Sequence, residues 1–239
     1  MLNNLSLNFS TIAFDADDTL WENEAFFRLT QARFAELLQE YTEPDHLAER
    51  LLDAERRNLG RYGFGIKGFV LSMIETAIDV TQAQVSAQVI QQLIEAGQDM
   101  LAHPIDLLPH VAETIATLAK THDLILITKG DLLDQERKLA QSNLGAYFSA
   151  VEIVSNKDTQ TYRDIFTRHT IDATRCMMVG NSMKSDILPA LDAGAWGTYI
   201  PHNHTWELER ADAPEGNPRF HSATSMQELA PLIARLEAL

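Results

Sequence analysis

Runs of apolar and β-branched residues without polar alternation recur along the chain, and each run ends in small, polar or turn-forming residues. Uninterrupted apolar runs of this length are typical of strands that are buried on both faces of a parallel sheet. The pattern predicts strands at residues 11–16, 124–128, 151–155, 176–180 and 197–200.

Helical patterns lie between the last four predicted strands, at about residues 131–143, 159–169 and 185–192. Alternating strands and helices favour a doubly wound α/β sheet with right-handed crossovers. The first two strands, however, are separated by more than a hundred residues, and a crossover helix needs only the last part, about residues 108–121. We therefore expect an insertion between these strands.

The inserted segment carries apolar residues at helical spacing in four sets. These sets are Phe27, Phe34, Leu38 and Tyr41; Leu47, Leu51 and Leu52; Val70, Met73, Ile74 and Ala77; and Val85, Val89, Leu93 and Ile94. Thr81 is the expected N-cap of the fourth helix, and residues 58–68, with four glycines, are the loosest joint. The pattern predicts an α/β core domain of residues 1–22 and 104–239 and a four-helix cap domain of residues 23–103.

Composition and charge narrow the class of protein. A chain of 239 residues with 45% hydrophobic and 22% charged residues can build its own core as a soluble globular protein. The 19 Lys and Arg against 34 Asp and Glu give a net charge of −15, which disfavours nucleic acid as a partner. No apolar run approaches the ~20 residues that span a bilayer. A single cysteine, Cys176, and the lack of signal-peptide regions predict a cytoplasmic protein.

Three carboxylates, Asp15, Asp17 and Asp18, crowd the end of the first predicted strand. In a doubly wound sheet, ligands bind at the carboxyl ends of the strands. Neighbouring like charges repel one another unless a cation or a proton lies among them, and Mg²⁺ prefers carboxylate, water and phosphate oxygens. The cluster predicts a magnesium site, and the alternative is a solvated acidic turn that caps a helix.

Polar residues also follow the next three predicted strands. Thr128 and Lys129 end the second strand, where a hydroxyl and backbone N–H groups could bind phosphate, and Lys157 follows the third strand as a counter-charge. After the fourth strand, Asp186 stands at the start of a predicted helix, where it could hold a cation. Each residue alone is equally typical of a strand end, a surface charge or a helix cap. Together they indicate a site, because all of these residues lie at the same edge of the predicted sheet.

The order Asp-x-Asp-x-Thr, then Thr, Lys and Asp, resembles the motifs of the haloacid dehalogenase-like (HAD) superfamily, over nearly the whole chain. The resemblance implies a Rossmann-like α/β core with an inserted helical cap. It implies that Asp15 is the nucleophile and Asp17 the general acid/base, with Asp15 and the Asp17 carbonyl on Mg²⁺. It further implies that Thr128 binds the transferred phosphoryl group, that Lys157 steadies Asp15 and the phosphate, and that Asp186 completes the metal site.

Two positions depart from the family pattern. The fourth motif commonly begins Gly-Asp, whereas this chain has Asn181 after its glycine, so Asn181 could reach the metal only through its amide oxygen or a bridging water. The third motif usually reads Lys-Pro, but Lys157 is followed by Asp158. Its assignment rests on position, and Lys129 is the rival lysine.

These features predict a magnesium-dependent phosphatase that acts on a small phosphomonoester through an aspartyl-phosphate at Asp15. The alternatives are a phosphomutase or haloacid dehalogenase of the same fold, and a non-catalytic protein that binds a phosphate ligand or a partner. A dehalogenase has little need of Asp17 as an acid, and binding alone requires neither Asp15 nor Asp17.

Three aromatic side chains near the predicted site have less specific patterns. Trp21, just after the first motif, is expected to be a buried plug at the hinge rather than a substrate contact. His202 and His204 follow the fifth strand and could suggest a transition-metal site. Since no third ligand stands nearby in the sequence, we expect an ordinary loop there.

Overall fold

The computed structural model describes residues 8–238, which divide into two compact units. Of the described residues, the core unit comprises 8–22, 105–129 and 135–238, and the helical unit comprises 23–104 and 130–134. The sequence had assigned residues 130–134 to the core domain. They group with the helical unit, in which Lys67 Nζ pairs with Asp131 Oδ2 at 2.7 Å.

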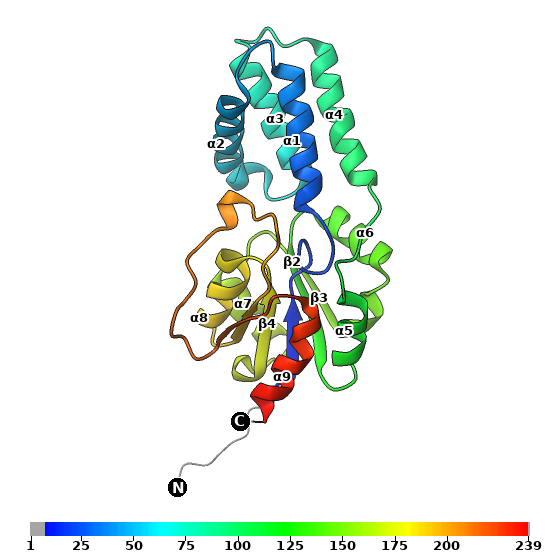
Figure 1. Cartoon of the computed structure of the whole chain (residues 1–239), viewed down its shortest axis with the longest axis vertical. Helices are drawn as coiled ribbons and strands as arrows, with labels where there is room; N and C mark the ends of the chain where they lie inside the picture. The colour runs from blue at the N-terminus through cyan, green and yellow to red at the C-terminus, as the bar shows by residue number, and fades with distance from the viewer. Residues whose placement is uncertain (1–7, 239) are drawn as a thin grey trace. The chain divides into compact units, whose positions relative to one another are not determined.

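The core unit is built on a six-stranded sheet with strand order β3-β2-β1-β4-β5-β6. Figure 1 labels β2, β3 and β4 of this sheet. All five strand pairs are parallel, which confirms the predicted doubly wound α/β class. The strands are β1 (Thr11–Phe14), β2 (Asp123–Lys129), β3 (Ala150–Val154), β4 (Cys176–Gly180), β5 (Trp196–Tyr199) and β6 (Phe220–Ser222). The chain adds β2 and β3 on one side of β1 and β4 to β6 on the other. The direction of strand addition therefore reverses between β1 and β4, where sheets of this kind bind ligands.

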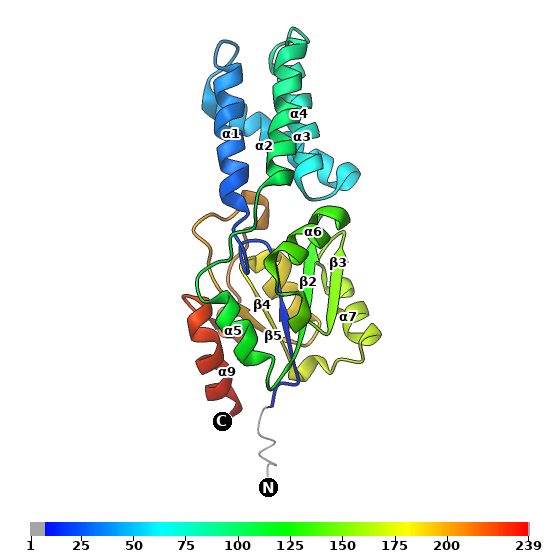
Figure 2. The same ribbon diagram turned by 90° about the vertical axis from the view of Figure 1, so that its right-hand side faces the viewer.

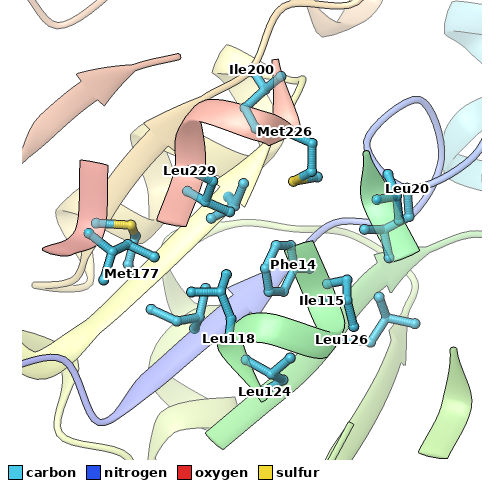
Figure 3. Packing of buried hydrophobic residues seen from close by; sticks show 14 of the residues in the cluster. Phe14, Leu20, Ile115, Leu118, Leu124, Leu126, Met177, Ile200, Met226 and Leu229 are labelled. Carbon is cyan, nitrogen blue, oxygen red and sulfur yellow. The ribbon is translucent and has the colours of Figure 1, made fainter. Parts of the chain in front are cut away.

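Alternate residues of the central strands enter two separate apolar layers, because successive side chains of a strand point to opposite faces. Phe14, Leu126 and Met177 pack on one face against α5 (Val111–Leu118) and α9 (Leu229–Glu237) (Figure 3). Ala13 and Ile125 pack on the other face, against α7 (Thr159–Arg168) and α8 (Leu188–Asp192). Burial on both faces explains why the strand sequences are apolar without alternation.

Five α-helices belong wholly or largely to the core unit. They are α5 (Val111–Leu118), α6 (Leu132–Ser142), α7 (Thr159–Arg168), α8 (Leu188–Asp192) and α9 (Leu229–Glu237). The sequence analysis missed β6 and α9. A strand of three partly exposed or exposed residues such as β6 has too little apolar pattern to be recognised from sequence.

The predicted helix at residues 185–192 differs at its beginning. A π-helical turn, η3 (Met183–Ile187), precedes α8, in which Pro189 has no backbone N–H. The Ser185 carbonyl, which would accept that missing N–H in an α-helix, instead accepts the hydroxyl of Tyr162 at 3.1 Å. The sequence around Pro189 therefore produces a wider turn next to the candidate site.

The helical unit contains α1 (Glu24–Leu38), α2 (Pro44–Tyr62), α3 (Ile66–Val80) and α4 (Ala87–Ala102), which are labelled in Figure 2. The four helices share one apolar core. Thr81 does not cap the fourth helix as predicted. Ser86 does so by accepting the Val89 N–H at 3.2 Å, whereas Thr81 ends α3. None of the described helices has the length and apolarity needed to cross a membrane.

The predicted loose joint at residues 58–68 is much shorter than expected, because α2 continues to Tyr62 and α3 begins at Ile66. Gly63 and Gly65 supply the turn with φ angles of 73° and 116°, a region that side chains with a Cβ rarely adopt. Of the other two glycines, Gly60 has open space at the position of a Cβ, whereas a Cβ on Gly68 would lie 3.0 Å from the Gly63 carbonyl oxygen, so three of the four glycines serve the turn.

Candidate active site

A buried lysine lies between two buried carboxylates at the carboxyl ends of the strands, near the point where the order of strand addition reverses. Lys157 Nζ donates to Asp15 Oδ1 and, at 2.8 Å, to Asp186 Oδ1. Asp15 directly follows β1, whereas Lys157 and Asp186 come from the segments after β3 and β4. The carboxyl ends of parallel strands bring the three side chains together, and the lysine compensates part of their negative charge.

The position of Asp186 depends on the residues just before it. The Ser182 N–H donates to Asp186 Oδ2 at 2.9 Å and orients the carboxylate. A Cβ on residue 180 would lie 2.3 Å from the same oxygen, so only glycine permits this approach. Asp158, which stands where the family motif has proline, caps α7 by accepting the Thr161 N–H at 2.9 Å.

Asp17 points its carboxylate at residues that the sequence analysis did not select. Lys138 Nζ contacts both oxygens at 2.9 and 3.1 Å, Gln135 Nε2 donates to Oδ2 at 2.8 Å, and Trp21 Nε1 donates to Oδ1 at 2.7 Å. Burial raises the pKa of Asp17, but the Lys138 charge and these hydrogen bonds outweigh it and hold the pKa below its ordinary value. Asp17 is therefore ionised in this arrangement. Trp21 is fully buried, as expected of a plug.

Asn181 contacts two oxygens that the resemblance assigns to the metal. One terminal atom of its amide lies 3.1 Å from Asp15 Oδ2 and 3.2 Å from the Asp17 carbonyl oxygen. With nitrogen at this position, the amide donates to both oxygens and to Thr19 Oγ1 at 3.1 Å. With oxygen there, three oxygens would converge and would need a cation among them. With the Asn181 amide turned in this way, its oxygen, Asp15 Oδ2 and the Asp17 carbonyl would suit a divalent cation, and Asp186, which shares Lys157 with Asp15, would add negative charge nearby.

The protonation of Asp15 also indicates a need for more positive charge. Burial and the neighbouring Asp186 raise the pKa of Asp15 to about 7, against the opposing effect of Lys157. Burial lowers the pKa of Lys157, but the two carboxylates raise it above its ordinary value, so this lysine stays charged. A single ammonium therefore leaves Asp15 only partly ionised at neutral pH, and a bound cation would complete its ionisation.

The two remaining predicted residues, Thr128 and Lys129, end β2. Thr128 is fully buried at the second-last position of the strand. Lys129 Nζ, however, is engaged by Ser185 Oγ at 2.7 Å and by the carboxylate of Glu209, a residue of the short helix η4 (Glu207–Glu209). The Glu209 carboxylate also accepts Ser182 Oγ at 2.6 Å. Of the two rival lysines, Lys157 is the one that contacts Asp15.

Gln135, Lys138 and Glu209 are polar groups of this region that the sequence analysis missed. Gln135 and Lys138 are three residues apart on α6, so they share a helix face, and both are buried. A lysine and a glutamine on the buried face of a helix that follows the Thr128 strand would have been a usable signal. Glu209 lies in an irregular segment with no such pattern.

Comparisons with known proteins identify the family of this chain. Residues 9–194 match the family model of the haloacid dehalogenase-like hydrolases. A haloacid dehalogenase-like family hydrolase from Xanthomonas campestris has a crystal structure that is 38% identical in sequence, with a TM-score of 0.87 over 96% of this chain and 92% of that one. No curated protein sequence is significantly similar to this chain.

Two more distant structures share the fold. The HAD-hydrolase YfnB from Bacillus subtilis, described as bound to magnesium, is 16% identical, with a TM-score of 0.67 over 95% of this chain and 99% of that one. The 2-haloacid dehalogenase from Pseudomonas syringae pv. Tomato is 21% identical, with a TM-score of 0.60 over the same shares. The family model covers most of the residues and the Xanthomonas structure nearly all of them, and the chain belongs to the haloacid dehalogenase-like hydrolases.

Proposed function

We propose that this hydrolase is a magnesium-dependent phosphatase that cleaves a small phosphomonoester through an aspartyl-phosphate at Asp15. The observation that carries the proposal is the second carboxylate, Asp17, which follows Asp15 by two residues and lies close enough for the two charges to interact. Halide leaves carbon without a proton, whereas an alkoxide leaving phosphorus needs one, so an acid beside the nucleophile favours phosphoryl transfer. Magnesium, when bound, would neutralise charge on Asp15 and on the substrate phosphate.

In the first step, Asp15 attacks phosphorus, the bond to the ester oxygen breaks, and Asp17 gives its proton to the departing alkoxide. In the second step, ionised Asp17 takes a proton from water, whose oxygen attacks phosphorus and releases phosphate from Asp15. Lys138 stabilises the ionised form that the second step requires. Before the first step, the Asp17 carboxyl must leave Lys138 and bind a proton.

The test is a panel of phosphomonoesters and 2-haloacids assayed with the whole chain, in magnesium and in excess chelator. We expect phosphate release that requires magnesium, and no halide release. Halide release that persists in chelator would instead identify a dehalogenase. Transfer of the phosphoryl group to a second substrate hydroxyl, with no net phosphate release, would indicate a phosphomutase. A chain that binds phosphate mimics but turns over nothing in the panel would be a binding protein.

Asp17→Asn is expected to slow hydrolysis of alkyl phosphates by about 10²- to 10⁴-fold, since the proton transfer is lost. Asp17→Asn should slow the first step of nitrophenyl phosphate hydrolysis less, because the nitrophenolate leaving group needs no proton. Rapid-quench measurement of both steps checks this difference. Asp123→Asn is the matched control, since this exposed residue begins β2 at the opposite edge of the sheet. Equal slowing of the first step for both leaving groups would contradict the acid role.

Asn181→Asp is expected to strengthen magnesium binding to the free protein by about tenfold or more, or ~1.4 kcal/mol, since a carboxylate replaces a competing amide donor. Asn181→Ala separates the two causes, because it removes the amide without adding a ligand. Calorimetric titration of magnesium into the three proteins, with and without a phosphate mimic, measures the affinities. Identical affinities would mean that residue 181 does not influence the metal.

A further inference from the structure

A second group of metal-ligating side chains lies in the core unit, apart from the Asp15 and Asp186 carboxylates. His202, from the segment after β5, lies between Asp18 and Glu22, which both come from the segment after β1: Nδ1 is 3.5 Å from Asp18 Oδ1, and Nε2 is 3.2 Å from Glu22 Oε1. One ligand atom from each of the three residues lies within 4.8 Å of the others. The side chains of His202 and Asp18 are each only 8% exposed, and that of Glu22 is 28% exposed. The structure thus supplies the further ligands that are absent from the sequence around His202.

The hydrogen bonds of His202 indicate which ring nitrogen is available. Nδ1 lies 3.0 Å from the His204 carbonyl oxygen, to which it can only donate, and 3.4 Å from the His204 backbone nitrogen, from which it could only accept. The shorter contact favours the tautomer with the proton on Nδ1, which leaves the lone pair on Nε2. A histidine that ligates a metal through one nitrogen commonly donates its other N–H to a backbone carbonyl in the same way.

The Nε2 lone pair faces another acceptor. Glu22 Oε1 lies 3.2 Å from His202 Nε2 and is buried, and it accepts no hydrogen bond from any of residues 8–238. Two acceptors at this distance repel unless a positive charge lies between or beside them. Ligands at about 2.0–2.2 Å from one metal ion are separated from each other by about the same distance as these two atoms.

We propose that His202, Glu22 and Asp18 bind a transition-metal dication such as Zn²⁺, Mn²⁺ or Co²⁺. An imidazole nitrogen with two carboxylate oxygens suits these borderline ions better than Mg²⁺, which prefers oxygen ligands alone. The site is chemically distinct from the all-oxygen set at Asp15. An ion there would link the segment after β1 to the segment after β5. The proposal does not rest on the reaction assigned to Asp15.

The alternative to a metal ion is a second proton on His202, between Nε2 and Glu22 Oε1. The imidazolium would then pair with both carboxylates without any metal. The two arrangements differ in their response to added metal, and that difference is the basis of the test.

The test titrates Co²⁺ into the metal-free whole chain in the presence of excess Mg²⁺, which competes for oxygen-only sites. Visible absorption of bound Co²⁺ and calorimetry are the readouts. We expect one high-affinity equivalent in the wild type. His202→Ala and Glu22→Gln should weaken it by about 100-fold or more, because loss of an outer partner alone typically costs about 10- to 100-fold. His204→Ala keeps the carbonyl that accepts Nδ1 and should leave the affinity unchanged.

Thermal unfolding of the same proteins keeps the result interpretable if a variant folds poorly. Co²⁺ should raise the unfolding temperature of the wild type and of His204→Ala, and should have no such effect in Glu22→Gln. Wild type that binds no Co²⁺ in excess Mg²⁺ would overturn the proposal, as would equal Co²⁺ affinity in His202→Ala. Equal destabilisation of both variants with and without Co²⁺ would identify the protonated ion pair instead.

Discussion

Replacement of Asp15 by Asn is expected to lower phosphate release by ~10⁴-fold or more, the scale at which hydrolases lose activity without their nucleophile. The amide is nearly isosteric, but it cannot attack phosphorus and cannot form the aspartyl-phosphate. Steady-state hydrolysis in saturating magnesium measures the loss. Acid quenching of a reaction with labelled substrate should trap phosphoprotein in the wild type and none in the variant.

The fold of Asp15→Asn should be retained. Lys157 keeps its contact with Asp186 at 2.8 Å, and the Thr19 hydroxyl, which donates to Asp15 Oδ2 at 3.0 Å, can still donate to the amide oxygen. Circular dichroism and thermal unfolding check this. Asp123→Asn again serves as the control for an Asp-to-Asn change. Turnover close to that of the wild type in a folded Asp15→Asn protein would exclude the nucleophile assignment, whatever the substrate.

Lys157→Met is expected to destabilise the protein by about 3–5 kcal/mol, because it leaves Asp15 and Asp186 buried without their shared cation. Activity should also be lost, since the two carboxylates would repel each other and the incoming phosphate. Urea unfolding of both proteins without metal gives the difference in free energy of unfolding. Lys120→Met, on the exposed residue that follows α5, is the matched control.

A double variant tests the cause of that destabilisation. Adding Asp186→Asn to Lys157→Met removes one of the two unpaired charges and should recover part of the lost stability. If the double variant is less stable than Lys157→Met by the full cost of an independent substitution, the loss reflects side-chain packing rather than charge. The two residues are in contact, so a coupling between their effects is expected.

Much of the core architecture could be predicted from local sequence. Strands buried on both faces require continuous apolar residues, and Cys176–Gly180 of β4 was therefore predicted with its observed bounds. The helical period likewise predicted the inserted helices, because each buries one face in a shared core. The local pattern failed to predict the N-cap of α4, which depends on the path of the chain rather than on residue type. Ser86 and Thr81 both have a capping hydroxyl, and only the path of the chain between α3 and α4 selects Ser86.

The meeting of Asp15, Lys157 and Asp186 follows from sequence and topology together, because the carboxyl ends of parallel strands share one edge. The ion-pair partner of each lysine does not follow from sequence and topology. Lys129 and Lys157 each follow a strand, and only the tertiary structure shows that Glu209 engages the first while Asp15 engages the second. Such ion pairs depend on side-chain reach and burial across the sheet, which no local pattern encodes.

The same limit applies to Asp17 and to His202. Sequence alone determined the α/β class, the inserted helices and the edge of the sheet that carries the carboxylates, since these depend on local periodicity and on strand direction. Tertiary structure alone decided that Lys138 from α6 holds Asp17 and that His202 reaches Asp18 and Glu22. Those contacts join residues far apart in the chain, and the free energy of a buried charge depends on which groups the fold brings within a few ångströms of it.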